Sequence, residues 1–292
     1  MTISKSTLLH LRFPFSFFLM PVFCFAAGVA FTGDWWRLVL VFVILHLMVY
    51  PASNGYNSYY DKDEDSIGGL EKPPPVSKEL LYTALIIDGI ALVLSVLVSI
   101  EFAVGILLYG LVSKAYSNDA IRLKKMPILG WITVGVFQGA FTFLMVYQGV
   151  AQVSLEQLLE GKVLYGAILS TVLLLGSYPM TQIYQHEEDA RRGDMTISRM
   201  LGIKGTFLFT GAAFGLATGG YVWYFTQYFS LNLAMVFVTT LFPVVLFFGW
   251  WFLKVLKDAQ QANFKYTMRL NLLSAIFMNL FFIGLAIWLQ IK

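Results

Sequence analysis

Three polar residues in the segment NGYNSYYDKDEDSIGGLEKPPP are spaced as ligands of one metal ion would be on a helix. Asn57, Asp61 and Asp65 occupy positions i, i+4 and i+8, directly after an apolar run. If the helix continues through the segment, all three side chains lie on one face, with about 6 Å of rise between neighbours. Carboxylates stacked at a helix C-terminus repel one another and the helix dipole, and a divalent cation relieves that repulsion. Oxygen ligands without His or Cys favour Mg2+.

The acids between these positions have a simpler interpretation. On a continuing helix Asp63 and Glu64 point away from the shared face, so we expect them to be solvated charges. All of the acids could simply solubilise a loop, and a single acidic segment would favour that view. A second polar segment decides against it.

That second segment reads YQHEEDARRGDMT. Gln185 and Asp189 are again four residues apart after an apolar stretch, and Glu188 lies beside them. Two acid-bearing helix ends in one compartment predict two halves that close around a cleft, with two metal ions bridging a polyphosphate. We therefore predict Asn57, Asp61, Gln185, Glu188 and Asp189 as metal ligands together with Asp65, and Asp61, Asp65 and Asp189 as catalytic.

Basic and hydroxyl side chains that could hold a diphosphate follow other apolar stretches. The segment YSNDAIRLKKMP places Arg122 and Lys124 near Tyr116, and Lys72 follows the first acidic segment. Taken singly, Arg122, Lys124 and Lys72 have no special significance. Together with two metal sites they are predicted to bind a diphosphate.

The composition shows which elements must position these residues. The chain has 292 residues, of which 58% are hydrophobic and 13% charged, whereas about a quarter of residues are charged in soluble domains. Apolar stretches long enough to span a bilayer recur about nine times, at 14–33, 36–57, 80–99, 102–118, 128–150, 163–184, 206–228, 231–254 and 270–290. We predict an all-α membrane protein, one domain over 1–292, with about nine helices bundled around a central cleft open to the cytoplasm.

The basic residues predict the orientation. With nine spans, Arg37, Lys162 and Lys292 are the only ones of the 20 Lys and Arg residues on one side. Because basic residues collect in cytoplasmic loops, the N-terminus and both acidic segments are expected in the cytoplasm, and the protein in a bacterial inner membrane. The net charge of +3 is then a basic rim attracted to membrane lipids, and no nucleic-acid partner is expected.

Three segments together, NSYYDKDED with a following Lys-Pro pair, YSNDAIRLKK and QHEEDARRGDMT, resemble the UbiA superfamily of intramembrane aromatic prenyltransferases. The resemblance covers essentially the whole chain. The family's first motif reads Asn, three residues, Asp, three residues, Asp, which Asn57, Asp61 and Asp65 match.

The second family motif usually reads Asp, three residues, Asp, followed by Gly-Lys and Thr. Here Asp189, Gly193 and Thr196 match, but Gln185 replaces the first Asp and Asp194 replaces the Lys. An amide keeps a carbonyl ligand and loses a charge.

Neighbouring residues could compensate for both departures. Glu187 or Glu188 could supply the missing carboxylate. Arg191 or Arg192 could replace the missing phosphate donor, and we count Arg192 among the diphosphate-binding residues.

The resemblance implies an enzyme. Its reaction is Mg2+-dependent transfer of an isoprenyl group from an isoprenyl diphosphate to a small aromatic or lipid acceptor, most often a quinone precursor. Aromatic side chains, 16% of the residues, could shield an allylic cation through cation-π contacts.

Two other classes of protein are less consistent with the sequence. A transporter generally needs polar groups near the membrane midplane, and Asp88 is the one acid well inside a predicted span. A CDP-alcohol phosphotransferase would need an Asp-Gly, two residues, Ala-Arg signature, which the sequence lacks. Transfer to a non-aromatic lipid acceptor remains an alternative within the prenyltransferases.

Overall fold

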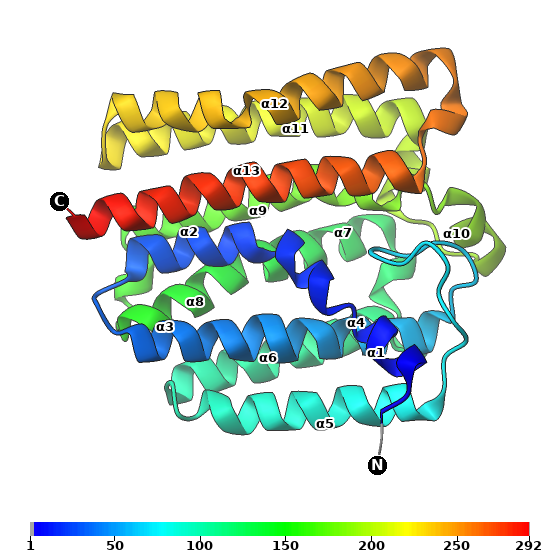
Figure 1. Ribbon diagram of the computed structural model, residues 1–292, viewed down its shortest axis with the longest axis horizontal. Coiled ribbons are helices and arrows are strands. Elements are labelled where there is room, and N and C mark those ends of the chain that lie inside the picture. Colours follow the sequence, from blue (N-terminus) through cyan, green and yellow to red (C-terminus); the bar gives the residue numbers. More distant parts are fainter. Residues whose placement is uncertain (1–2, 292) are drawn as a thin grey trace.

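The computed structural model describes residues 3–291, which form a bundle of long helices running side by side (Figure 1). No strand occurs among these residues. The α-helices are α1 (Lys5–Leu11), α2 (Met20–Ala30), α3 (Trp35–Phe42), α4 (Tyr50–Asp61), α5 (Lys78–Ser95), α6 (Ile100–Ser117), α7 (Pro127–Val136), α8 (Thr142–Ala151), α9 (Gly161–Gln182), α10 (His186–Arg192), α11 (Ile197–Tyr228), α12 (Leu231–Lys257) and α13 (Phe264–Ile291).

Short 3-10 and π-helical stretches join or extend several of these helices. The π-helical stretch η2 connects α3 to α4, and η4 connects α7 to α8, so each trio forms one continuous span. These stretches are η1 (Phe13–Phe18), η2 (Val43–Val49), η3 (Leu123–Lys125), η4 (Phe137–Phe141), η5 (Gln157–Leu159) and η6 (Ala259–Gln261).

Seven of the described helices are long and apolar enough to cross a membrane, or eight if the bent pair Lys5–Phe18 and Met20–Ala30 forms one span. The remaining candidate among the nine predicted spans is α5. Its 18 residues include Lys78, Glu79 and Asp88, and this charge lowers its suitability for a bilayer. An integral, multi-pass membrane protein is therefore supported, and the ninth span stays a prediction.

Serine side chains cap the N-termini of two of the long helices. Ser99 and Ser230 accept hydrogen bonds from the backbone of Phe102 (3.0 Å) and Leu233 (3.2 Å) at the starts of α6 and α12. These caps satisfy N–H groups that have no partner in the first helical turn. Such partners matter most in a membrane, where water is not available to replace them.

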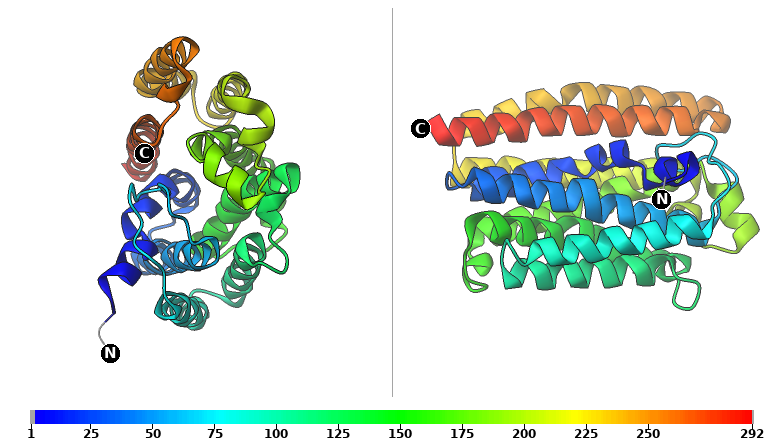
Figure 2. Two further views of the ribbon diagram at one scale, coloured as in Figure 1. Left: turned by 90° about the vertical axis from the view of Figure 1, so that its right-hand side faces the viewer. Right: turned by 60° about the horizontal axis from the view of Figure 1, so that its bottom comes forward.

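The helices alternate in direction and leave two distinct ends (Figures 1 and 2). The loop 62–77, the short helix α10 and the α12–α13 connection lie at one end, which we call the polar end. The C-terminus and the α5–α6 and α11–α12 connections lie at the other. The acidic segments and most of the basic residues therefore gather at the polar end, as their predicted common side requires.

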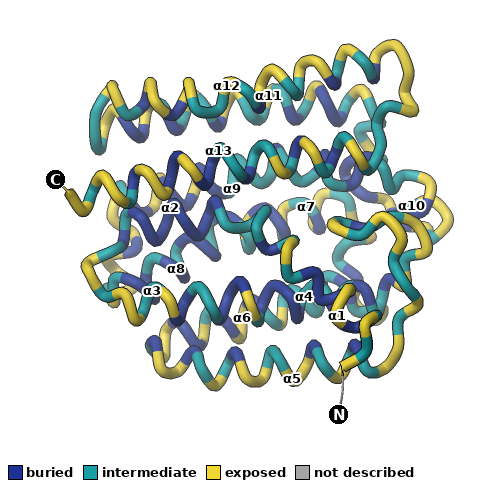
Figure 3. The backbone as a smooth tube through the Cα atoms, viewed as in Figure 1, coloured by how far each residue is buried: buried dark blue, intermediate teal, exposed yellow. Residues whose placement is uncertain are grey.

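Helix α2 packs against α8 and α13 near the centre of the bundle, and Figure 3 shows it largely buried. Phe25 of α2 stacks on Phe282 of α13, with ring centroids 4.6 Å apart. By contrast, α5 packs on the outside, against α4 and α6. Aromatic packing thus stabilises the centre of the helix bundle, and the clusters of charged residues lie at the polar end.

Candidate active site at the polar end

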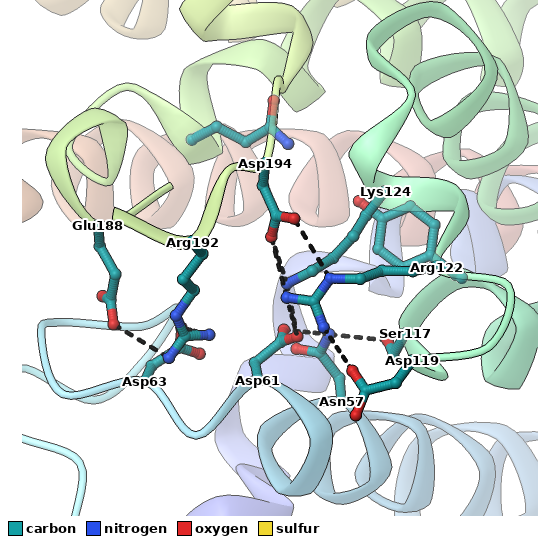
Figure 4. Close-up of polar contacts among 12 residues, drawn as sticks. Asn57, Asp61, Asp63, Ser117, Asp119, Arg122, Lys124, Glu188, Arg192 and Asp194 are labelled. Carbon is teal, nitrogen blue, oxygen red and sulfur yellow. Dashed lines mark hydrogen bonds and ion pairs between the residues drawn. The ribbon is translucent and has the colours of Figure 1, made fainter. Parts of the chain in front are cut away.

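The first acidic motif lies where α4 ends. Asn57 Nδ2 donates a 2.7 Å hydrogen bond to Asp61 Oδ2 and a 2.8 Å bond to Ser117 Oγ of α6. The two motif residues therefore lie on one helical face, as their spacing predicted, and α6 fixes their orientation (Figure 4).

The helix does not continue to Asp65, so the prediction of a three-residue face is wrong. Lys62 takes up a left-handed conformation (φ 50°), and its N–H bonds to Ser58 O, which ends α4 at Asp61. The side chain of Asp65 is 60% exposed and forms an ion pair with Arg191. Its role as a metal ligand stays a prediction that requires the loop to rearrange.

Asp63 also differs from its predicted role as a solvated charge. Its side chain is only 12% exposed and lies 2.9 Å from Arg192. The turn at Lys62 redirects the chain, so residue 63 faces inward where a helix would have turned it out. Glu64 is exposed, as expected.

The second motif does not sit at the end of an apolar helix, which corrects another prediction. Helix α9 ends at Gln182, and the separate helix α10 carries Asp189, with Gln185 at its N-cap position. Thr196 Oγ1 donates a 3.1 Å hydrogen bond to Asp189 Oδ2.

The two acidic segments nevertheless meet, as predicted. Arg192 connects Asp63 and the buried Glu188, whose Oε1 lies 3.3 Å from Arg192 (Figure 4). The backbone N–H of Glu64 donates to Glu188 Oε1 at 3.0 Å, and Gln185 Nε2 donates to Ser66 O at 3.3 Å. The exposed ion pair between Arg191 and Asp65 adds a further contact. Residues 63, 64, 65 and 66 therefore each contact α10 or its N-cap residue Gln185, and these four contacts dock the 62–66 segment onto α10.

Asp194, the acid that replaces the family's Lys, organises the basic loop after α6. It is completely buried and accepts hydrogen bonds from Arg122 Nε (3.2 Å) and Nη2 (3.1 Å). Lys124 Nζ lies 3.5 Å from the same carboxylate and 2.5 Å from Asp61 Oδ1. One buried acid therefore holds two cations beside the first motif (Figure 4).

The other predicted diphosphate-binding residues are placed differently. Tyr116 lines a cavity and shares a hydrogen bond with Tyr178 of α9. Lys72 is exposed on the 62–77 loop and is not among the residues that line the cavity.

This cavity, of about 370 Å3, extends from the polar end into the bundle. Asn57, Asp61, Lys124 and Asp189 lie at its mouth, and its wall includes residues of nine of the described α-helices. Deeper lining residues are mostly aromatic or aliphatic: Phe18, Tyr50, Tyr109, Phe137, Phe214, Tyr221, Phe237, Leu241 and Met278. The arrangement suits a molecule with an anionic head and an apolar tail.

Burial shifts the ionisation of the acids at the mouth. Desolvation, with a smaller contribution from the charge of Asp61, raises the pKa of Asp63 to about 7. Desolvation likewise raises the pKa of Asp189 to about 6. For Asp194, desolvation acts in the same direction, but the hydrogen bonds from Arg122 and the charge of Lys124 outweigh it and lower the pKa.

The oxygen donors suit Mg2+, which binds through one or two carboxylates plus substrate phosphates. Among residues 3–291, no three His, Cys, Asp or Glu side chains come close enough together to hold a metal ion. However, Glu188 Oε2 is buried without a hydrogen-bond partner, and desolvation together with the charge of Asp61 disfavours the ionised form of Asp63. The donor set therefore fits a cation whose coordination a phosphate ligand completes.

Sequence reasoning missed two residues of this region. The buried pairing of Asp194 depends on a contact between residues 72 positions apart, which spacing along a helix does not reveal. Arg12 lines the cavity from the junction of α1 and η1. Its place just before Pro14, where an apolar stretch begins, was the only sequence signal.

Comparisons with known proteins agree with this architecture. A model of the UbiA prenyltransferase family matches residues 18–281. A search of curated protein sequences found no match.

Several solved structures share the fold over nearly the whole chain. A UbiA homologue from Aeropyrum pernix K1 is 16% identical, with a TM-score of 0.70 over 96% of this chain and 98% of that one. A UbiA homologue from Archaeoglobus fulgidus bound to GPP and Mg2+ is 14% identical, with a TM-score of 0.67 over 97% and 99%. A digeranylgeranylglyceryl phosphate synthase is 20% identical, with a TM-score of 0.62 over 97% and 98%.

Proposed function

Since the chain belongs to the UbiA prenyltransferase family, we propose that it transfers an isoprenyl group from an isoprenyl diphosphate to an acceptor within the membrane. The whole chain, 1–292, acts as one such domain. The observation that carries the proposal is the cavity with acids and Lys124 at its mouth and aromatic residues in its interior. A diphosphate fits the mouth, and an isoprenyl tail fits the interior.

Binding of the diphosphate depends on both polar segments. Asn57, Asp61 and Asp189 would hold Mg2+ together with phosphate oxygens, and bound Mg2+ would stabilise the negative charge that develops on the leaving diphosphate. The homologue from Archaeoglobus fulgidus, whose structure contains GPP and Mg2+, supports this choice of ion and substrate. Asp65, Gln185 and Glu188 are the further proposed ligands, and Asp65 would have to leave Arg191 to serve.

Basic residues act on the leaving group. Lys124 reaches both Asp61 and the mouth, so it can turn from the carboxylate to a phosphate oxygen as the diphosphate enters. Arg122 stays bound to Asp194 and keeps the loop in place. Arg192 and Lys72 are the remaining proposed diphosphate donors.

The bond changes are simple. The bond between C1 of the isoprenyl group and the diphosphate oxygen breaks, a bond forms between C1 and the acceptor, and the acceptor loses a proton. Tyr109, Phe137 and Tyr221 line the cavity, where they would flank an allylic cation and help to exclude water, and aromatic faces stabilise such a cation. Tyr116 and its partner Tyr178 lie between this region and the mouth.

We propose an aromatic quinone precursor as the acceptor, the commonest choice in the family. A lipid carrying glycerol phosphate is the second candidate, because the fold is shared with a digeranylgeranylglyceryl phosphate synthase. Transport is less well supported, since Asp88, the one acid well inside a predicted span, is paired with Lys114 and neither residue lines the cavity.

One experiment tests the proposal. Purified protein in detergent is incubated with labelled geranyl diphosphate, Mg2+ and a panel of hydroxybenzoate, dihydroxynaphthoate and geranylgeranylglyceryl phosphate. A prenylated product of one acceptor, lost on chelation of Mg2+, is expected. Binding of geranyl diphosphate without any turnover, combined with flux of a solute in proteoliposomes, would contradict the proposal.

The polar end is proposed to face the cytoplasm of a bacterium because most Lys and Arg residues gather there. Reporters fused after residue 75, around 120 and around 194 should all read as cytoplasmic. A signal from the opposite side at any one of them contradicts the shared mouth.

A further inference from the structure

Arg12 is a buried cation on the cavity wall to which the proposed reaction assigns no role. It ends α1 in a left-handed conformation (φ 48°), which directs the chain into η1. The residue is only 8% exposed and lines the same cavity as Asn57 and Asp61.

Arg12 differs in its partners from the four cations that join the two acidic segments and the basic loop. Arg122, Lys124, Arg191 and Arg192 each have a carboxylate within ion-pair distance. Among the described residues, no carboxylate lies within 4.0 Å of Arg12. Arg12 thus has no direct ion-pair partner, and only the more distant charges of Asp63 and Asp61 act on it.

Backbone carbonyls hold the guanidinium in place without neutralising it. Nη1 donates to Gly68 O at 3.1 Å and Nη2 donates to Asn54 O at 3.2 Å, while the Phe15 ring lies 5.4 Å from Cζ. Nε is buried and has no hydrogen-bond partner. The group is therefore fixed in orientation and keeps N–H donors to spare, since a guanidinium carries five.

A buried charge without a counterion is unfavourable unless an ion of opposite sign arrives. A fixed guanidinium at the mouth of a cavity is preorganised for planar or tetrahedral oxyanions. We propose that Arg12 binds an anionic oxygen group of a substrate, a phosphate or a carboxylate. The inference rests on the proposed function and adds a second cationic wall to the mouth, contributed by the N-terminal helix and separate from the Lys124 side.

The two sources of such a group are the isoprenyl diphosphate and an acidic acceptor. Both would present an anionic oxygen group to Arg12, so the experiment tests each of them in a separate arm. The first arm measures the affinity of inorganic pyrophosphate with Mg2+ by calorimetry. The second measures KM for hydroxybenzoate, dihydroxynaphthoate and geranylgeranylglyceryl phosphate at saturating geranyl diphosphate.

A purely architectural role is the competing explanation, because Arg12 also ties α1 to the 62–77 loop and α4. His10 provides the matched control: it is 2% exposed, lies on α1, and bonds through Nε2 to Pro74 O of the same loop at 2.7 Å. It does not line the cavity. His10→Ala should lower the unfolding temperature and leave ligand constants unchanged.

Arg12→Gln should weaken one of the two measured interactions by about ten- to a hundredfold, the usual range for a lost charged hydrogen bond. Weaker pyrophosphate binding would show that Arg12 binds the diphosphate. A raised KM for the acceptor, with normal pyrophosphate binding, would show that Arg12 binds the acceptor. Arg12→Lys keeps the charge but cannot reach both carbonyls, so it should lose stability more than affinity. It decides the question if Arg12→Gln does not fold.

The proposal is overturned if Arg12→Gln keeps wild-type constants in both arms, or if His10→Ala reproduces its losses. It is also overturned if Arg12→Lys loses affinity in step with stability. A wild-type protein that neither binds pyrophosphate nor makes product contradicts the proposed function itself. That result is distinct from failure of the Arg12 assignment, which requires an active wild type.

Discussion

The two acidic segments perform similar proposed tasks on very different supports. Asn57 and Asp61 belong to the last turns of a long span, and their hydrogen bond lies along a helical face that Ser117 steadies. Asp189 belongs to the seven-residue helix α10, which ends at Gly193 in a left-handed conformation. One site is built into the membrane bundle, and the other is docked onto it.

Different forces hold the two sites. The first depends on backbone hydrogen bonds, on close helix packing and on ion pairs from Lys124 and Arg122 to Asp61, which are buried and therefore little screened by salt. The second depends on ion pairs between α10 and the 62–66 segment, including an exposed pair between Arg191 and Asp65. Because exposed pairs contribute little and are screened by salt, the contact between Arg191 and Asp65 is the one most easily broken as a substrate enters.

The largest expected effects are losses of turnover at the two proposed metal-binding segments, and the first of these concerns Asp61. Asp61→Ala removes a proposed metal ligand and leaves Lys124 without its nearest carboxylate, so turnover should fall on the order of a thousandfold. Asp119→Ala is the matched control, since it also pairs with Arg122 but its side chain is 71% exposed. Initial rates of prenyl transfer measure both. Equal losses in the two variants would show that the cluster, and not Asp61, carries the effect.

A second experiment concerns the docked site and its missing carboxylate. Asp189→Ala should abolish turnover because it removes a proposed metal ligand that lines the cavity and accepts a hydrogen bond from Thr196. Gln185→Asp restores the charge that the family motif has, and should retain activity or lower the Mg2+ concentration needed for half-maximal rate. Rates are measured against Mg2+ concentration. Full activity of Asp189→Ala removes this residue from the mechanism.

The fold was largely predictable because long apolar stretches have few alternatives to helices in a membrane. Each of the nine predicted stretches coincides with helical structure, although α5 falls short of the composition of a span. The i, i+4 spacing also predicted the Asn57–Asp61 contact correctly, since a continuous helix fixes that geometry.

The loops could not be predicted in the same way. The prediction extended the helix past Asp61 to Asp65, but the left-handed turn at Lys62 ends it at Asp61. As a result Asp63 is buried and Asp65 exposed, the reverse of what a continuing helix predicts. The pairing of Asp194 with Arg122 joins two loops and follows from tertiary packing. Sequence spacing therefore describes what lies on one helix and is uninformative about contacts between segments.

A smaller loss is expected when the basic loop is loosened. Asp194→Asn leaves Arg122 buried beside an amide and weakens the hold on Lys124, so kcat/KM for the isoprenyl diphosphate should fall about ten- to a hundredfold. The effect should appear mainly in KM, because the proposed metal ligands remain.

Asp88→Asn is the control for this variant. It breaks another partly buried pair, with Lys114, away from the cavity. Stability of that variant should fall without a change in KM. A rise in KM in the control, or none in Asp194→Asn, contradicts the assignment of Asp194 as a positioning residue.

The smallest expected effect distinguishes Asp63 from its exposed neighbour through pH. Burial raises the pKa of Asp63 to about 7 in the folded protein, against about 4 in an unfolded chain. The folded state then binds the proton more tightly, so this residue favours folding at low pH and its contribution is lost as the pH rises from about 4 to about 7.

Thermal unfolding of the metal-free protein in detergent tests this argument. The unfolding temperature should fall between pH 5 and pH 8, and it should fall less in Asp63→Asn. Glu64→Gln, at an exposed position, should follow the wild type. If the unfolding temperature of Asp63→Asn depends on pH as steeply as that of the wild type, another buried acid causes the pH dependence. Asp189 is then the next residue to test, because its pKa is raised to about 6.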